Sequence, residues 1–194
     1  MNSKLLSIVR FYFAQSVFNT TCHRKSYNRL DQKKNFISKV VFGFSAVTII
    51  LLILQVIGLE NDLKSLLVTV AFVGLLLTGG SLLFQLLFKD DLASQMYSHK
   101  NSAEKYKALR DEYMALVEEI MSGNINEDIL RSNKDSLRIR YAYIGENAPT
   151  TSEEDYSEAQ KALGIAENSD EEFTWSNSEI DRFLPQELRL NSQP

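Results

Sequence analysis

The sequence is poor in the residues from which catalytic and metal sites are commonly built. Its 194 residues include one cysteine, Cys22, and two histidines, His23 and His99. A single cysteine excludes an internal disulfide, and this inventory cannot supply the four Cys and His ligands of an ordinary zinc cluster. Cys22 and His23 are neighbours, so their side chains diverge on a helix instead of forming a catalytic pair. No phosphate-binding glycine motif occurs either, and we expect neither an enzyme nor a bound cofactor.

Charge is missing from two long segments. Residues 40–59 and 65–88 carry none, and the short link between them holds Glu60, Asp62 and Lys64. Each segment reaches the length of about 20 residues that a helix needs to cross the hydrocarbon core of a bilayer. The alternative is a buried helical hairpin of a soluble bundle, but a soluble helix usually keeps a polar face. The sequence therefore predicts a transmembrane hairpin.

The overall composition, 44% hydrophobic and 24% charged with a net charge of −4, conceals this division. Residues 1–39 carry +7, residues 40–88 carry −1 and residues 89–194 carry −10. Lys and Arg residues are frequent before the first expected span and after the second, whereas the link between the spans contains only Lys64. By the positive-inside rule, we expect both termini in the cytoplasm and the link outside.

Each expected span has one face of small and weakly polar residues. In the order of the chain, these candidate residues are Ser45, Thr48, Gln55, Gly74, Thr78, Ser81 and Gln85. Such residues decide where helices touch in lipid, so one interpretation is packing within the hairpin and between subunits of a homo-oligomer. The other is that they line a water-filled path in that oligomer. Neither span contains a charged residue, which argues against a proton relay or a charge-selective filter.

The basic segment before the spans mixes cations with aromatic residues and contains no proline or glycine. These properties favour a helix, for which three roles remain open. It can lie on an anionic membrane surface, pack against the later cytosolic helices, or bind nucleic acid directly.

The region after the spans has a helical pattern. From Leu92 to Ile120, apolar positions recur at steps of three and four, as in a coiled coil, and include His99 and Tyr106. We expect this helix to continue the second span. His99 is either a satisfied interhelical histidine or a pH or ligand contact.

Two shorter helices are expected to follow. Asn126 is a candidate N-cap for the first, which Pro149 would terminate. Thr151 begins a candidate capping box in which Glu154 would reach back to the cap, and Gly164 would end that helix. The acidic tail is expected to be flexible, with a docking segment around five apolar residues. They are Phe173, Trp175, Ile180, Phe183 and Leu184.

Together these features predict an all-α membrane protein, in which a two-helix transmembrane hairpin joins an N-terminal basic helix to a C-terminal cytosolic helical bundle. The expected regions are a cytosolic or interfacial basic helix at 1–36, the hairpin at 37–88 with spans at about 40–59 and 65–88, a cytosolic helical region at 89–163 and an acidic flexible tail at 164–194.

Four features follow one another along the chain. A basic helix contains the segment Cys22-His23-Arg24-Lys25-Ser26-Tyr27-Asn28-Arg29-Leu30, and two spans joined by a minimal loop come after it. The series His99, Ala103, Tyr106 and Leu109 follows the spans, and Asn147-Ala148-Pro149, Tyr156 and Ala159 come last. This order resembles the SLATT family of two-transmembrane effectors, with its His-and-Arg segment, its His-x-x-x-Ala-x-x-Tyr-x-x-Leu pattern and its Ala-Pro…Tyr…Ala ending, and the likeness covers roughly residues 5–163.

The resemblance implies a membrane effector of a bacterial anti-phage conflict system. Such a protein would lie in the inner membrane and oligomerise to form a pore or disrupt the bilayer, giving abortive infection. Its trigger would be an upstream nucleotide- or nucleic-acid-synthesising sensor, a reverse transcriptase or a nucleotidyltransferase. The matched residues His23, His99 and Tyr106 would couple the signal. The alternative is a non-enzymatic anchor or scaffold that recruits a cytosolic partner through its C-terminal helices and acidic tail.

Overall fold

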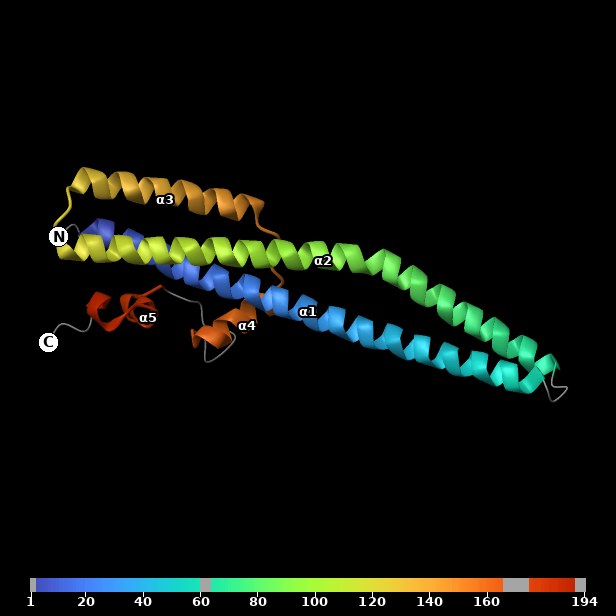
Figure 1. Ribbon diagram of the computed structural model, residues 1–194. Helices are drawn as coiled ribbons and strands as arrows, with labels where there is room; N and C mark the ends of the chain where they lie inside the picture. The colour runs from blue at the N-terminus through green and yellow to red at the C-terminus, as the bar shows by residue number, and fades with distance from the viewer. Residues whose placement is uncertain (1–2, 60–63, 166–174, 191–194) are drawn as a thin grey trace. The chain divides into compact units, whose positions relative to one another are not determined.

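The computed structural model describes residues 3–59, 64–165 and 175–190, and every regular element in these ranges is helical (Figure 1). The elements are α1 (Ser3–Leu59), α2 (Lys64–Ser122), α3 (Glu127–Asn147), α4 (Glu153–Leu163), α5 (Asn177–Asp181) and the 3₁₀ turn η1 (Gln186–Leu188). The expected all-α fold class is therefore confirmed.

The helices form two compact units. The first unit contains Met1–Asn28 and Tyr97–Pro194, and the second contains Arg29–Met96. Both α1 and α2 contribute to both units, so the basic segment at 1–36 is the first part of α1 and not a separate helix. The sequence permits this continuity because the first proline of the chain is Pro149, and proline is the strongest breaker of a helix interior.

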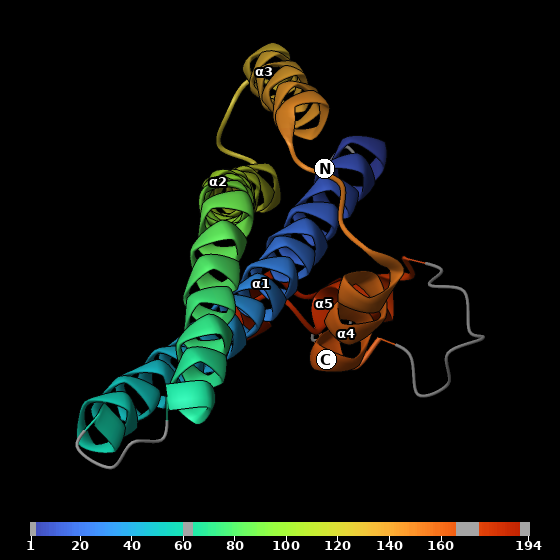
Figure 2. The ribbon, with the colours of Figure 1, turned by 90° about the vertical axis from the view of Figure 1, so that its right-hand side faces the viewer.

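The first unit has an apolar core to which α1, α2, α3 and the C-terminal segment all contribute. Figures 1 and 2 show α3 on one side of the long helices and α4 and α5 on the other. The buried residues include Leu6, Val9 and Phe13 of α1, Leu109, Tyr113 and Val117 of α2, Leu137 and Ile144 of α3, and Ile180 and Leu184. Because the apolar face of the basic segment is buried here, the structure favours packing against the later helices over the two other roles considered for it.

The termini of α3 and α4 follow from local sequence with one correction. The Asn126 side chain caps α3 by accepting a hydrogen bond from the Asp128 amide at 2.9 Å. The capping box of α4 is shifted by one residue, because Ser152 is the N-cap and Asp155 reaches back to it. Asp155 also accepts a hydrogen bond of 2.7 Å from Ser26 of α1, so the residue that completes the capping box makes a tertiary contact as well.

Gly164 ends α4 as expected. Its φ of 63° lies in the left-handed region, which glycine adopts without steric cost. Its carbonyl accepts a hydrogen bond of 2.7 Å from Arg182. This bond ties the end of α4 to the C-terminal segment.

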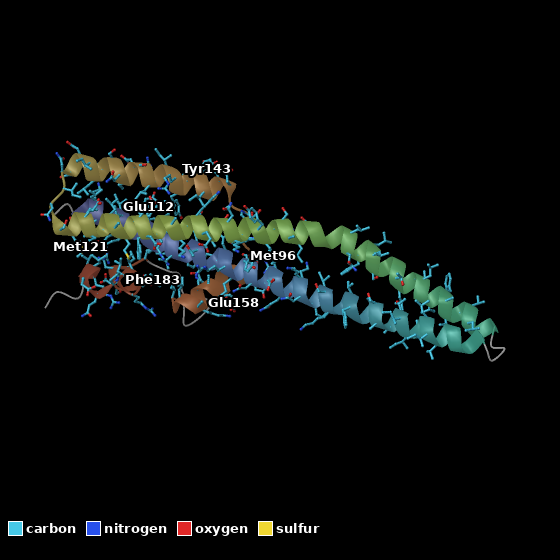
Figure 3. All side chains as sticks on the ribbon, viewed as in Figure 1. Met96, Glu112, Met121, Tyr143, Glu158 and Phe183 are labelled. Carbon is cyan, nitrogen blue, oxygen red and sulfur yellow. The ribbon has the colours of Figure 1, made fainter. Side chains whose placement is uncertain are left out.

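The second unit is an antiparallel pair of helices with an apolar surface. The most apolar stretch of α1 has no buried residue, and that of α2 is 11% buried. Figure 3 shows side chains extending outward along both helices. Both helices are long and apolar enough to cross a membrane, and an apolar outer surface is suited to lipid because lipid tails are as apolar as these side chains. The hairpin expected from the missing charges is thus present.

The C-terminal segment differs from the expected flexible tail. In the described residues 175–190, α5 and η1 are folded, and Ile180 and Leu184 are buried in the core of the first unit. The expected docking segment is thus seen at Ile180 and Leu184, and these apolar residues are buried because they pack in one core with residues of α1, α2 and α3. Phe173, which the expected docking segment included, lies outside the described residues.

Candidate functional site

Two histidines meet in the first unit, one from each long helix. The Nδ1 atoms of His23 on α1 and His99 on α2 are 3.0 Å apart and buried. The ring of Tyr106 stacks on His23 with a centroid distance of 5.7 Å and an interplanar angle of 12°. Because Tyr106 follows His99 by seven residues, both lie on the same face of α2. The structure therefore brings together the three residues expected to couple the signal.

The contact between His23 and His99 requires that at least one of the two imidazoles is neutral. A hydrogen bond between two Nδ1 atoms needs one nitrogen that carries a hydrogen and one that does not. Burial, with a smaller contribution from His99, lowers the pKa of His23 from 6.5 to about 4. His23 is consequently neutral at physiological pH, so the contact is a hydrogen bond between aromatic rings in an apolar setting.

Tyr141 of α3 and Asn19 of α1 pack next to the His23–His99–Tyr106 contact. The ring of Tyr141 packs edge-on against Tyr106, with centroids 5.6 Å apart. The Tyr141 hydroxyl accepts a hydrogen bond of 2.8 Å from Asn19, one turn before His23. Gly145 also lies beside the Tyr106 hydroxyl, because a Cβ atom there would be in ordinary van der Waals contact with it at 3.4 Å. Asn19 was not among the predicted site residues, although its position four residues before His23 places it on the same face of α1.

Cys22 lies on α1 beside this group but has no nucleophilic role. It is buried in a small cluster with Phe18 and Ala159. Burial and the nearby negative charge of Asp155 raise the pKa of its thiol to about 12. Because the thiolate is the reactive form, this cysteine is inert while it stays buried.

A buried ion pair joins α1 to the C-terminal segment. The Arg10 side chain is completely buried, and its Nη2 lies 2.5 Å from Asp181 Oδ1. Within the described residues, Arg10 Nε is buried without a hydrogen-bond partner. This pair was not predicted from the sequence, because the two residues are 171 positions apart.

The weakly polar residues of the hairpin divide between buried and exposed positions. Gly74 and Ser81 are buried, Thr48 and Gln85 are half-buried, and Ser45 and Thr78 are exposed. The side chain of Gln55 lies outside the described residues.

The four hydroxyl groups on this face hydrogen-bond to their own helices. Ser45, Thr48, Thr78 and Ser81 donate to the carbonyls of Val41, Phe44, Gly74 and Thr78, respectively. Backbone carbonyls thus accept the hydrogen bonds of these hydroxyls, which the hydrocarbon core of a bilayer cannot accept.

The described residues contain no group of three or more His, Cys, Asp or Glu side chains that could hold a metal ion.

Comparison with known proteins supports the same assignment. No curated protein and no solved structure matches the chain. A family model, described as SMODS and SLOG-associating 2TM effector domain family 4, matches residues 5–179. The match includes both spans and the His23–His99–Tyr106 contact, which confirms the resemblance seen in the sequence. The chain therefore belongs to this family of two-transmembrane effectors, which act with upstream sensors in anti-phage conflict systems.

Proposed function

We propose that the protein oligomerises in the bacterial inner membrane and permeabilises it when an upstream sensor is triggered, so that the infected cell stops growing or dies. The supporting observation is that Ser45 and Thr78 are exposed on a hairpin surface that is otherwise largely apolar. Polar side chains within a membrane usually face other helices or a water-filled cavity. A second copy of the hairpin provides such a partner.

The two groups of hairpin residues have different roles in this proposal. Ser81 is buried, and we assign it to packing of α2 within one copy. Gly74 is also buried, but a Cβ atom there would meet nothing within 4 Å, so no neighbouring helix requires glycine at this position. Ser45 and Thr78 are exposed, so they mediate contacts between copies in the resting oligomer. After triggering, the hairpins rotate and these hydroxyls line the aqueous path, together with the half-buried Thr48 and Gln85.

The His23–His99–Tyr106 contact couples the signal to the hairpin. It joins α1 to α2 in the first unit, and neither helix is interrupted between these residues and its span. A change in the packing of the two helices at the histidines is therefore carried along both backbones. The sensor that causes this change is a reverse transcriptase or a nucleotidyltransferase, and both termini of the effector face it in the cytoplasm.

The proposal is tested by removing the exposed hydroxyls. The double variant Ser45→Leu/Thr78→Leu is expected to insert normally but to lose membrane depolarisation after phage infection, measured with a potential-sensitive dye. The matched control is Val47→Leu/Leu82→Ile, which changes exposed apolar residues of the same two helices. If the hydroxyl variant depolarises as strongly as the wild-type chain, these residues neither join copies nor line a path.

The coupling role needs a variant that keeps the core filled. His99→Leu removes the hydrogen bond between the two imidazoles and replaces the histidine by an apolar side chain of similar volume, so that no cavity is left. We expect it to insert and oligomerise but to lose the response to infection. If the response persists with normal size, the contact is structural only.

The alternative of an anchor that recruits a partner through a free tail is less well supported. Ile180 and Leu184 of the tail are buried in the first unit and are not available to a partner. An anchor would also produce no permeability change, so the dye measurement separates the two functions.

A further inference from the structure

In the described part of the chain, every hydrogen bond that the Arg10 side chain donates goes to the C-terminal segment, residues 175–190. Besides the ion pair with Asp181, Arg10 donates to the carbonyls of Leu188 at 3.1 Å and Asn177 at 3.5 Å. Asp181 Oδ1 also accepts the Leu190 amide at 3.1 Å. The buried cation of α1 is therefore balanced by a segment from the opposite end of the chain.

Aromatic contacts extend this docking along α1. The ring of Trp175 meets Phe11 and Phe18 edge-on, with centroid distances of 5.7 and 6.0 Å. Trp175 has a φ of 54°, a left-handed conformation that is unfavourable for a residue other than glycine. This strained residue is the one whose ring contacts α1 through Phe11 and Phe18.

The segment also contacts α2. Pro185 and Leu188 share a surface groove with Met114 and Glu118 of α2. The segment therefore spans the two long helices within the first unit, where the histidine contact also joins them. Its presence limits how far these helices can change their packing.

The physical properties of the segment suit an element that is either fully docked or fully released. Its helix α5 has five residues and η1 has three, and helices this short are not stable alone in water. Docking leaves Arg10 buried, and a buried charge without its counter-charge is strongly destabilising. Loss of Asp181 from its place should therefore release the segment and open the Arg10 surface together.

We propose that the Arg10 surface of α1 is a docking surface whose resting occupant is residues 175–190, and that this segment is an autoinhibitory latch. Docked, it holds α1 and α2 in the resting packing. Released, it lets the effector act on the membrane, so the inference rests on the proposed function. Asp181, Leu184 and Leu188 lie beyond the range 5–179 matched by the family model.

The accessibility of Cys22 provides a probe of the latch. It is the single cysteine of the chain, it is buried, and Trp175 packs against its cluster. The full-length chain in membranes is treated with a maleimide, and the labelling rate is compared with the membrane potential of uninfected cells. Asp181→Ala is expected to increase the labelling rate at least tenfold and to depolarise cells without infection.

Two controls accompany this variant. Glu187→Gln removes an exposed carboxylate of the same segment and is expected to leave both measurements unchanged. The double variant Arg10→Leu/Asp181→Leu replaces the ion pair by apolar side chains and is expected to restore slow labelling and a normal potential. Restoration shows that the effect of Asp181→Ala comes from the unpaired Arg10 and not from general misfolding.

A truncation tests the latch without a substitution in the core. A chain that ends after residue 174 is reconstituted in vesicles loaded with a fluorescent dye, and a synthetic peptide of residues 175–190 is added. We expect the truncated chain to leak dye and the peptide to stop the leak and slow Cys22 labelling. A peptide carrying Asp181→Ala is expected to do neither.

The outcomes separate the latch from the proposed function. If Asp181→Ala and the truncated chain label faster while the cells remain polarised, and infection still depolarises wild-type cells, the segment is only structural and the latch is overturned. If Asp181→Ala leaves labelling slow, the segment does not depend on this ion pair and the latch is also overturned. If infection of wild-type cells causes no depolarisation, the proposed function itself fails.

Discussion

In the first unit, Phe13 and Leu109 are almost completely buried, whereas in the second unit Phe42 and Leu75 are 75% and 69% exposed. The same two helices, α1 and α2, carry both patterns. Burial from water stabilises the first unit, but lipid tails are as apolar as leucine, so packing of small residues must decide contacts in the second. Different interactions therefore determine the packing of the two parts of the same helix: burial of apolar side chains from water in the first unit and contacts between small residues in the second.

The largest expected effect comes from removing a buried aromatic ring. Phe13→Ala should lower the free energy of unfolding of the first unit by about 3–5 kcal/mol, because it removes apolar contacts and leaves a cavity. Phe42→Ala, on the exposed surface of the hairpin, should change it little. Denaturant unfolding in detergent, followed by the fluorescence of Trp175, measures both. Equal losses at the two positions would contradict the division into two units.

The next largest effect is the opposite test, in which a charge is placed on an exposed position. Leu76→Arg should reduce membrane insertion at a cost of about 2.5–3.5 kcal/mol, the usual penalty near the centre of a span. Ile139→Arg on the exposed surface of α3 should change stability by less than about 0.5 kcal/mol. Resistance to alkaline extraction of membranes measures insertion. Normal insertion of Leu76→Arg would show that this position does not face lipid.

The same division explains which features could be predicted from the sequence. The hairpin was predictable because membrane solvation acts on each residue separately and removes charge from a whole segment. The caps at Asn126 and Gly164 were predictable because they depend on backbone geometry within a few residues. The α4 cap was misplaced by one residue, and the local motif contains no sign of the hydrogen bond that Asp155 accepts from Ser26, 129 positions away.

The candidate site was predictable residue by residue but not as an arrangement. His23 and His99 were identified through separate motifs, yet their contact spans 76 positions and follows from the antiparallel return of α2 along α1. No local spacing indicates such a contact. Arg10 was missed for the same reason, since a single arginine on a basic helix looks like a solvated cation until its tertiary partner is known.

The third prediction concerns the pH dependence of the first unit. His23 faces His99 and Tyr106 and feels the charge of Asp155, and its pKa in the folded protein is about 4, below the ordinary value of 6.5. Between pH 6.5 and pH 4, His23 binds a proton in the unfolded chain but not in the folded protein. The free energy of unfolding that is present above pH 6.5 therefore declines as the pH falls toward 4. The decline attributable to His23 should be roughly 2–3 kcal/mol.

Unfolding midpoints measured from pH 7 to pH 4 test this decline. His23→Asn is the matched variant, because its amide can replace the Nδ1 hydrogen bond but does not titrate in this range. Its stability should fall less steeply with pH than that of the wild-type chain. Parallel pH profiles would assign the decline to carboxylates elsewhere in the unit.

The smallest predicted effect has the opposite sign and concerns one hydroxyl group in each unit. In the hairpin, the Thr78 hydroxyl donates to the carbonyl of Gly74 one turn earlier. In the core of the first unit, the Tyr113 hydroxyl is buried without a hydrogen-bond partner among the described residues, and burial raises the pKa of this phenol. A tyrosine hydroxyl is too far from its own backbone to use the solution that threonine uses.

Tyr113→Phe should therefore stabilise the first unit by about 1 kcal/mol, since a buried polar group without a partner is costly and the ring itself is retained. Thr78→Val should not stabilise the hairpin in the same way, because it removes a hydroxyl whose hydrogen bond is already made. Denaturant midpoints followed by Trp175 fluorescence measure the first change, and oligomer retention in detergent measures the second. A loss of stability in Tyr113→Phe would mean that the hydroxyl is bound by an ordered water, and that the first unit satisfies its buried polar atoms as completely as the hairpin does.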